Sequence, residues 1–101
     1  MKCIVWGVSP LRQVGKNGSI LIEFHCISPL DWLDKKNGFI GQKFKIYQIW
    51  NPGVDGGCMV DGDLNKMPAL PFEAHFETHT YNNHEYVDAI QIGGHVNQQI
   101  A

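Results

Sequence analysis

Residues Phe72–Tyr81 have the sequence FEAHFETHTY, and this stretch decides the fold class. Every second position is apolar or small, whereas the positions between them, up to His79, carry a carboxylate or an imidazole. A period of two is typical of a β-strand that buries one face and exposes the other. The Asn82-Asn83 pair that follows suits a tight turn, because asparagine tolerates a positive φ. Since Glu85–Ile92 is rich in β-branched residues, the stretch predicts a β-hairpin.

The same reasoning predicts further strands at Lys2–Val8, Ser19–Ile27 and Lys43–Trp50. The Asn17-Gly18 pair before the second of these is typical of a two-residue hairpin turn. In Ser19–Ile27 we expect an inward face made of Ile20, Ile22, Phe24 and Cys26. In Lys43–Trp50 we expect Phe44, Ile46 and Trp50 to point inward and Lys43, Lys45 and Tyr47 to point outward.

The segments between these strands complete the architecture. Ser28–Asn37 begins with a Ser-Pro pair and ends at Asn37-Gly38, which predicts one helix of about two turns. The long Asn51–Pro71 segment is rich in glycine, and within it Cys58–Val60 is expected to form a short strand. The sequence therefore predicts an all-β fold, a small five-stranded OB-like barrel with one short helix, in a single domain over residues 1–101.

Composition excludes several classes of protein. The chain has 101 residues and is 44% hydrophobic, which is enough for one core and too apolar for a disordered chain. Eight basic residues against ten acidic ones exclude a polycationic tail. The charge is uneven, because residues 1–50 hold seven basic and three acidic groups, whereas residues 51–101 hold one basic and seven acidic groups. A local basic surface in the first half is therefore possible.

The three cysteines, Cys3, Cys26 and Cys58, show no metal-binding or redox spacing. Cys3 and Cys26 lie on strand patterns and are expected to be buried, whereas Cys58, in the glycine-rich segment, is expected to be accessible. With no signal-peptide pattern and no apolar run of about 18 residues, we expect a soluble cytoplasmic protein with reduced thiols and no membrane contact.

No enzyme motif or phosphate-binding loop is present, so we expect neither catalysis nor a cofactor. His75, Glu77, His79 and His84 lie close together in the sequence and leave a small metal-binding domain as one alternative. On a strand, however, His75 and His79 are about 13 Å apart, which is too far for one ion to bridge directly. We therefore expect a solvated strand surface there and no metal.

Lys43, Lys45 and Tyr47 suggest a binding surface, because they alternate on one strand. Ammonium groups hold the phosphates of a single-stranded nucleic acid, and an aromatic ring stacks on any base. The preceding hairpin adds Arg12 and Lys16.

Two segments carry a resemblance to a known family. Leu11–Gly18 resembles the basic hairpin wing of the small single-stranded-DNA-binding proteins of filamentous phages, in which a Gly-Lys turn separates the first two strands. Met67–Phe76, followed by Tyr86–Ile92, is similar to the closing hairpin of that family. The resemblance implies an OB-like barrel, a homodimer and the coating of single strands during replication, with Arg12 and Lys16 as wing contacts.

We therefore predict single-stranded DNA binding with little sequence preference, as in replication of a phage or mobile element, with RNA as a possible ligand. Arg12, Lys16, Lys43 and Lys45 are predicted to hold phosphates, and a base is predicted to stack on Tyr47 or Trp50, with Tyr47 preferred. Besides the metal-binding domain, the alternative is an adaptor that binds a protein partner through the acidic C-terminal half.

Overall fold

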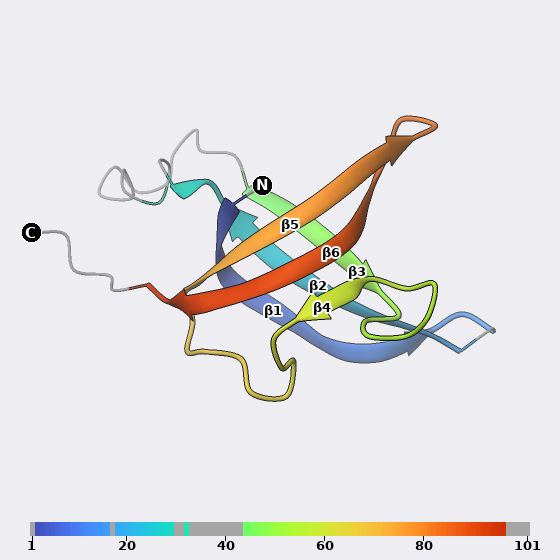
Figure 1. Ribbon diagram of the computed structural model, residues 1–101, viewed down its shortest axis with the longest axis horizontal. Coiled ribbons are helices and arrows are strands. Elements are labelled where there is room, and N and C mark those ends of the chain that lie inside the picture. Colours follow the sequence, from blue (N-terminus) through green and yellow to red (C-terminus); the bar gives the residue numbers. More distant parts are fainter. Residues whose placement is uncertain (1, 17, 30–31, 33–43, 97–101) are drawn as a thin grey trace, which may run out of the picture.

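The computed structural model describes residues 2–16, 18–29, 32 and 44–96, and these residues are folded mainly as β-strands (Figure 1). The strands are β1 Lys2–Val14, β2 Ser19–Ile27, β3 Phe44–Trp50, β4 Met59–Asp61, β5 Phe72–Tyr81 and β6 His84–His95. The all-β prediction is confirmed. Each predicted strand is present, and the short strand expected at Cys58–Val60 is β4.

The six strands form one sheet in the order β3-β2-β1-β5-β6-β4, antiparallel except for the β4/β6 pair. β5 follows the long 51–71 connection and returns to pair with β1, which is a Greek-key order. The predicted five-stranded OB-like barrel is not confirmed, because the sheet has six strands and does not close, with β3 and β6 not neighbours in it. Lys45 of β3 forms an ion pair with Glu85 of β6 across this opening.

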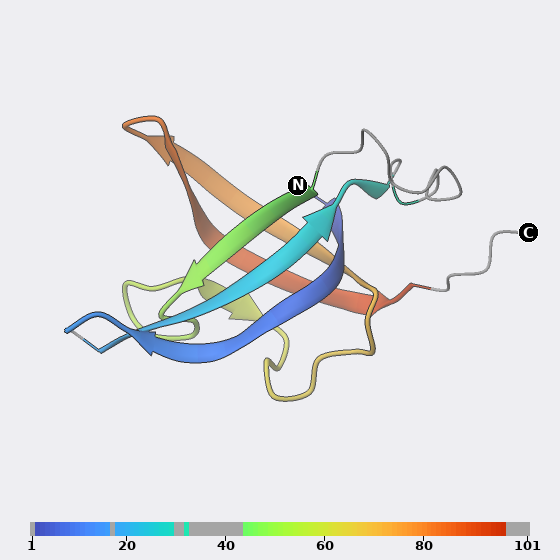
Figure 2. The same cartoon turned by 180° about the vertical axis from the view of Figure 1, so that it is seen from behind.

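The sheet curls so that β1–β3 form one layer and β4–β6 the other, as the two opposite views show (Figures 1 and 2). The core lies between these layers. Phe24 of β2 makes edge contacts with Phe72 and Phe76 of β5, at ring-centroid distances of 6.4 and 6.0 Å. The inward faces expected for β2 and β5 are confirmed at Ile22, Phe24, Cys26, Phe72, Ala74 and Phe76. The prediction for Ile20 is wrong, because this side chain, at the start of β2, is 40% exposed.

β1 is longer than predicted and is irregular at two places along its ladder with β2, between Val5 and Gly7 and between Ser9 and Arg12. Each irregularity adds one residue on β1 and bends the strand, as β-bulges do. At the first, Val5 stays in the core while Trp6 is 44% exposed on the other side of the sheet. Trp6 points outward by the ordinary alternation of a strand, and the bulge moves the next inward position from Gly7 to Val8, which packs against the core.

Two connections follow local rules of turn formation. Asn82 and Asn83 have φ of 50° and 64°, as expected for the β5–β6 turn. Asn51, with φ of 46°, ends β3, and its Oδ1 accepts a hydrogen bond of 2.9 Å from the Ile20 amide. This bond fixes the 51–57 loop to the start of β2.

Part of the predicted helix at Ser28–Asn37 lies outside the described residues, as does Lys43. Within the described part, the Trp32 amide donates a hydrogen bond of 2.9 Å to the Ser28 carbonyl, an i to i+4 contact of helical type. No helix among the described residues is both long and apolar enough to cross a bilayer.

All three cysteines are free thiols and all are buried. The prediction for Cys3 and Cys26 is confirmed, but the prediction of an accessible Cys58 is wrong, because this side chain packs in the core with 3% exposure. Its amide is bonded to the Trp50 carbonyl at 3.1 Å, which turns the residue inward immediately before β4.

Candidate functional site

The two faces of β3 are the reverse of those predicted. Tyr47 and Ile49 point into the core, and Phe44, Ile46 and Trp50 point to the surface. Tyr47 is 2% exposed and stacks on Phe76, with ring centroids 4.2 Å apart and planes 11° from parallel. The predicted role of Tyr47 as an exposed base-stacking platform is therefore wrong, because its ring is already covered by another ring in the core.

Lys45 shares the inward side of β3 with Tyr47, at the rim of the core. Its ammonium lies 4.8 Å from the centroid of the Tyr47 ring and pairs with Glu85. The structure thus separates Lys45 from the opposite face of β3, to which Trp50 belongs. The sequence had predicted that Lys45 would lie on one surface with Arg12 and Lys16. The structure does not bring Lys45 together with them.

The surface of β1–β3 that points away from the core is here called the outer face (Figure 2). An aromatic group lies at one end of this face. Trp6 of β1 contacts His25 of β2 and Phe44 of β3, at ring-centroid distances of 5.4 and 5.7 Å. Phe44 is 51% exposed. With Ile27 and Trp32, the Trp6 and Phe44 rings line an apolar pocket of about 300 Å³.

The middle of the outer face is polar. Strand register aligns Ser9 of β1, Glu23 of β2 and Gln48 of β3 in one row. Arg12 Nη2 donates a hydrogen bond of 2.7 Å to Glu23 Oε1, and Gln48 Nε2 donates one of 3.4 Å to Glu23 Oε2. These bonds, that of Arg12 first, hold the pKa of the Glu23 carboxyl below its ordinary value, so Glu23 is ionised at neutral pH.

The other end of the outer face combines a cation with a second indole ring. The register places Arg12, Leu21 and Trp50 side by side, and Trp50 is 37% exposed. The anchored 51–57 loop fixes the end of β3 at Trp50. Lys16 is exposed in the β1–β2 turn beyond this row. The structure therefore brings together Arg12 and Trp50, two of the residues predicted from the sequence.

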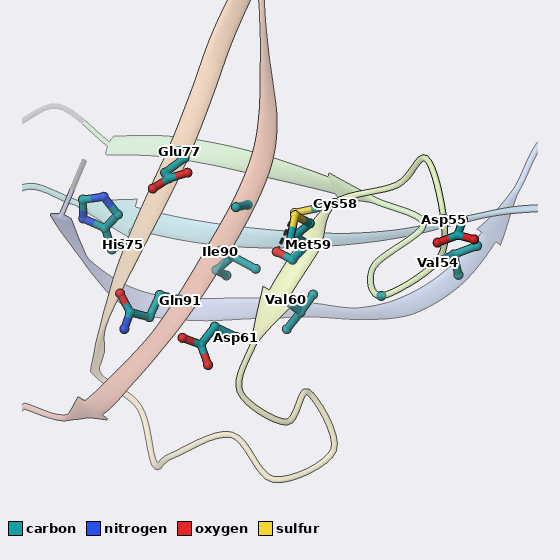
Figure 3. A pocket seen from close by; sticks show the side chains of 12 residues that line it. Val54, Asp55, Cys58, Met59, Val60, Asp61, His75, Glu77, Ile90 and Gln91 are labelled. Atoms are coloured by element: carbon teal, nitrogen blue, oxygen red, sulfur yellow. Dashed lines mark hydrogen bonds between the residues drawn. The ribbon is translucent and has the colours of Figure 1, made fainter.

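The opposite layer has a different character. A shallow pocket of about 430 Å³ lies over β4–β6, where His75, Glu77, Gln91 and Asp61 surround its polar part (Figure 3). Asp55 also lines it. Because three carboxylates repel a phosphate group, this pocket is not suited to nucleic acid.

The histidines predicted as an alternative metal site do not form one group. His79 Nδ1 lies 2.7 and 2.8 Å from the two Asp88 oxygens and its ring stacks on Tyr86, whereas His75 belongs to the pocket. In the described parts of the chain, no three His, Cys, Asp or Glu side chains lie close enough together to hold a metal ion.

Sequence reasoning missed Trp6, Phe44, Glu23 and Gln48 as residues of this face. The alternation in β2 indicated an outward Glu23, but nothing in the sequence paired it with Gln48. Trp6 lies outward by alternation from the buried Val5, but nothing in the sequence indicated that it contacts Phe44 of β3. Phe44 was assigned to the core together with the rest of its strand face.

Comparison of the chain with protein-family models, curated proteins and solved structures gives no match. The resemblance to the phage proteins therefore stays a prediction, and the chemistry of the outer face is the basis for a functional proposal.

Proposed function

We propose that the outer face of β1–β3 binds single-stranded nucleic acid. The observation on which the proposal rests is the presence of exposed aromatic rings at both ends of one sheet face, Trp6 with Phe44 and, across the sheet, Trp50. Exposed rings beside a guanidinium form a surface on which unpaired bases stack while the cation holds a phosphate.

The topology supports this surface. The Greek-key order β5-β1-β2-β3 is the order we propose for an OB-like barrel that remains open between β3 and β6. OB-folds are partly open Greek-key barrels that bind oligonucleotides over the face of their second and third strands. In this chain, β2 and β3 form the middle and the edge of the outer face.

The distribution of charge supports the same surface. Arg12 and Lys16 lie on the outer face and on its adjoining turn, and the carboxylate-lined pocket lies on the other layer. With about two or three phosphate contacts, log K should fall with log[salt] with a slope between about −1.4 and −2.1. We further propose DNA as the ligand and replication as the setting, with a homodimer as the functional form, as the resemblance implies.

The test is titration of the protein with fluorescent oligo-dT and oligo-U at several salt concentrations, with duplex DNA of the same length as a control. Trp6→Ala should weaken binding about five- to 150-fold, since stacking of one base on an aromatic ring contributes roughly 1–3 kcal/mol. Tyr81→Ala is the matched control, because Tyr81 is also exposed but lies on β5. Equal effects of the two substitutions would contradict the proposed surface.

A charge test uses a second matched pair. Lys16→Ala should reduce the salt slope by about 0.7, the contribution of one phosphate contact to a single strand. Lys66→Ala removes the same charge from the 62–71 connection and should leave the slope unchanged. If no oligonucleotide binds, the adaptor alternative, which uses the acidic β4–β6 layer, replaces this proposal.

A further inference from the structure

Glu23 occupies an unusual position for a residue of a nucleic-acid-binding face. Its row lies between the row of His25, which contacts Trp6, and the row of Leu21, which ends at Trp50. Neighbouring rows on one strand are about 6.7 Å apart, since each residue advances the strand by roughly 3.3–3.4 Å. A base that stacks on a ring at either end therefore has its edge within reach of this carboxylate.

The carboxylate is fixed and its side chain is 19% exposed. Arg12 bonds one oxygen at 2.7 Å and Gln48 bonds the other at 3.4 Å, from strands on opposite sides of β2. An ionised carboxylate has about four acceptor positions, so both oxygens keep capacity for a further donor. The Gln48 amide also has a second N–H to donate.

A fixed carboxylate discriminates among the parts of a nucleic acid. It repels phosphates, and it accepts hydrogen bonds only from N–H groups of bases or from the 2′-hydroxyl of RNA. Guanine has two neighbouring donors, N1–H and the 2-amino group, next to the O6 acceptor. Thymine and uracil have one N–H between two carbonyl groups, and adenine and cytosine place one amino group beside an acceptor nitrogen. Only guanine offers both carboxylate oxygens a donor.

Building on the proposed function, we propose that Glu23, positioned by Arg12 and Gln48, gives the outer face a preference for guanine over other unpaired bases. The carboxylate accepts N1–H and the 2-amino group, and a neighbouring Gln48 or Arg12 N–H donates to O6. This inference adds a base preference to a surface that the aromatic rings alone would leave indifferent to sequence.

The test compares three labelled single strands of equal length in lithium buffer, which disfavours guanine quadruplexes. The strands are oligo-dT, a repeat of TTG, and the same repeat with inosine in place of guanine, which removes only the 2-amino group. A bidentate contact that distinguishes bases corresponds to about five- to 150-fold in affinity, and we expect the lower end at this partly exposed site. The guanine strand should therefore bind about fivefold more tightly than the other two.

Two variants separate a base contact from a simple charge effect. Glu23→Gln should abolish the advantage of guanine over inosine. Glu77→Gln removes one negative charge from β5, outside the outer face, and should preserve that advantage. If Glu23→Gln keeps the preference for guanine, or gains the same affinity for all three oligonucleotides, the proposed role of Glu23 is overturned. Glu23 would then be a partner that only masks the charge of Arg12.

The outcomes for the wild-type protein distinguish the two proposals. Binding to all three strands with equal affinity overturns the guanine preference and leaves the proposed function intact. Failure to bind any of them overturns both.

Discussion

Replacement of Tyr47 by alanine tests the reversed faces of β3 most directly. The ring is 2% exposed and stacks on Phe76 at 4.2 Å. Truncation of a buried large aromatic residue to alanine costs about 3–5 kcal/mol, and an aromatic pair contributes about 0.5–1.5 kcal/mol beyond its buried area. We therefore expect Tyr47→Ala to lower the free energy of unfolding by about 4 kcal/mol, which for a domain of this size lowers Tm by roughly 16 to 32 °C.

Tyr47→Phe is the matched control, because it keeps the ring and removes only the hydroxyl. That hydroxyl accepts a long contact of 4.0 Å from the Cys3 thiol, so its loss should cost less than about 1 kcal/mol. The assays are thermal melts and urea unfolding of both variants, followed by oligo-dT titration at a temperature where each is folded. If Tyr47→Ala melts within about 2 °C of the wild type and binds oligo-dT much more weakly, Tyr47 lies on the binding surface and not in the core.

Three further predictions follow from packing and charge. Burial, with a smaller effect of Asp88, raises the pKa of the Cys58 thiol to about 11. Cys58 should therefore react with a thiol reagent slowly in the native protein and rapidly in denaturant. Rapid labelling of the native protein would contradict the burial of Cys58. Gly57→Ala should lower Tm markedly, because a Cβ there would lie 2.0 Å from the Asn51 carbonyl oxygen. In the control Gly94→Ala the added Cβ meets no atom within 4 Å, so Tm should hardly change. Equal Tm values for the two variants would contradict the geometry of the 51–57 loop. The Lys45 ammonium lowers the pKa of Glu85, so this pair stabilises the fold above the ordinary carboxyl pKa and loses its effect as the pH falls through the lowered value. Lys45→Ala should therefore cost up to about 1 kcal/mol more at pH 7 than at pH 2, where the ion pair is lost and the contact of the ammonium with the Tyr47 ring remains. A cost independent of pH would exclude the ion pair as its cause.

Local patterns of side chains were enough to predict the strands and most of their faces. Where one face of a strand is charged and the other apolar, as in Phe72–Tyr81, only one orientation avoids the burial of charge, and the alternation indicates it correctly. The Asn82-Asn83 turn also follows from local chemistry, because both residues adopt a positive φ without a large steric cost. The outward position of Glu23 was predictable for the same reason, because it lies between the inward Ile22 and Phe24.

Tertiary structure alone decided the orientation of β3 and the composition of the outer face. Both faces of Phe44–Trp50 carry large apolar side chains, so the local pattern gives either orientation a similar energy. The choice was made by the fit of Tyr47 against Phe76, a residue 29 positions away that reaches it only when β5 packs over β3. The same holds for the contact of Trp6 with Phe44, which joins β1 to β3 across β2, and for Glu23, whose partners come from two neighbouring strands. Pairing between distant segments decides these features, because their energies depend on contacts that a single segment of sequence does not contain.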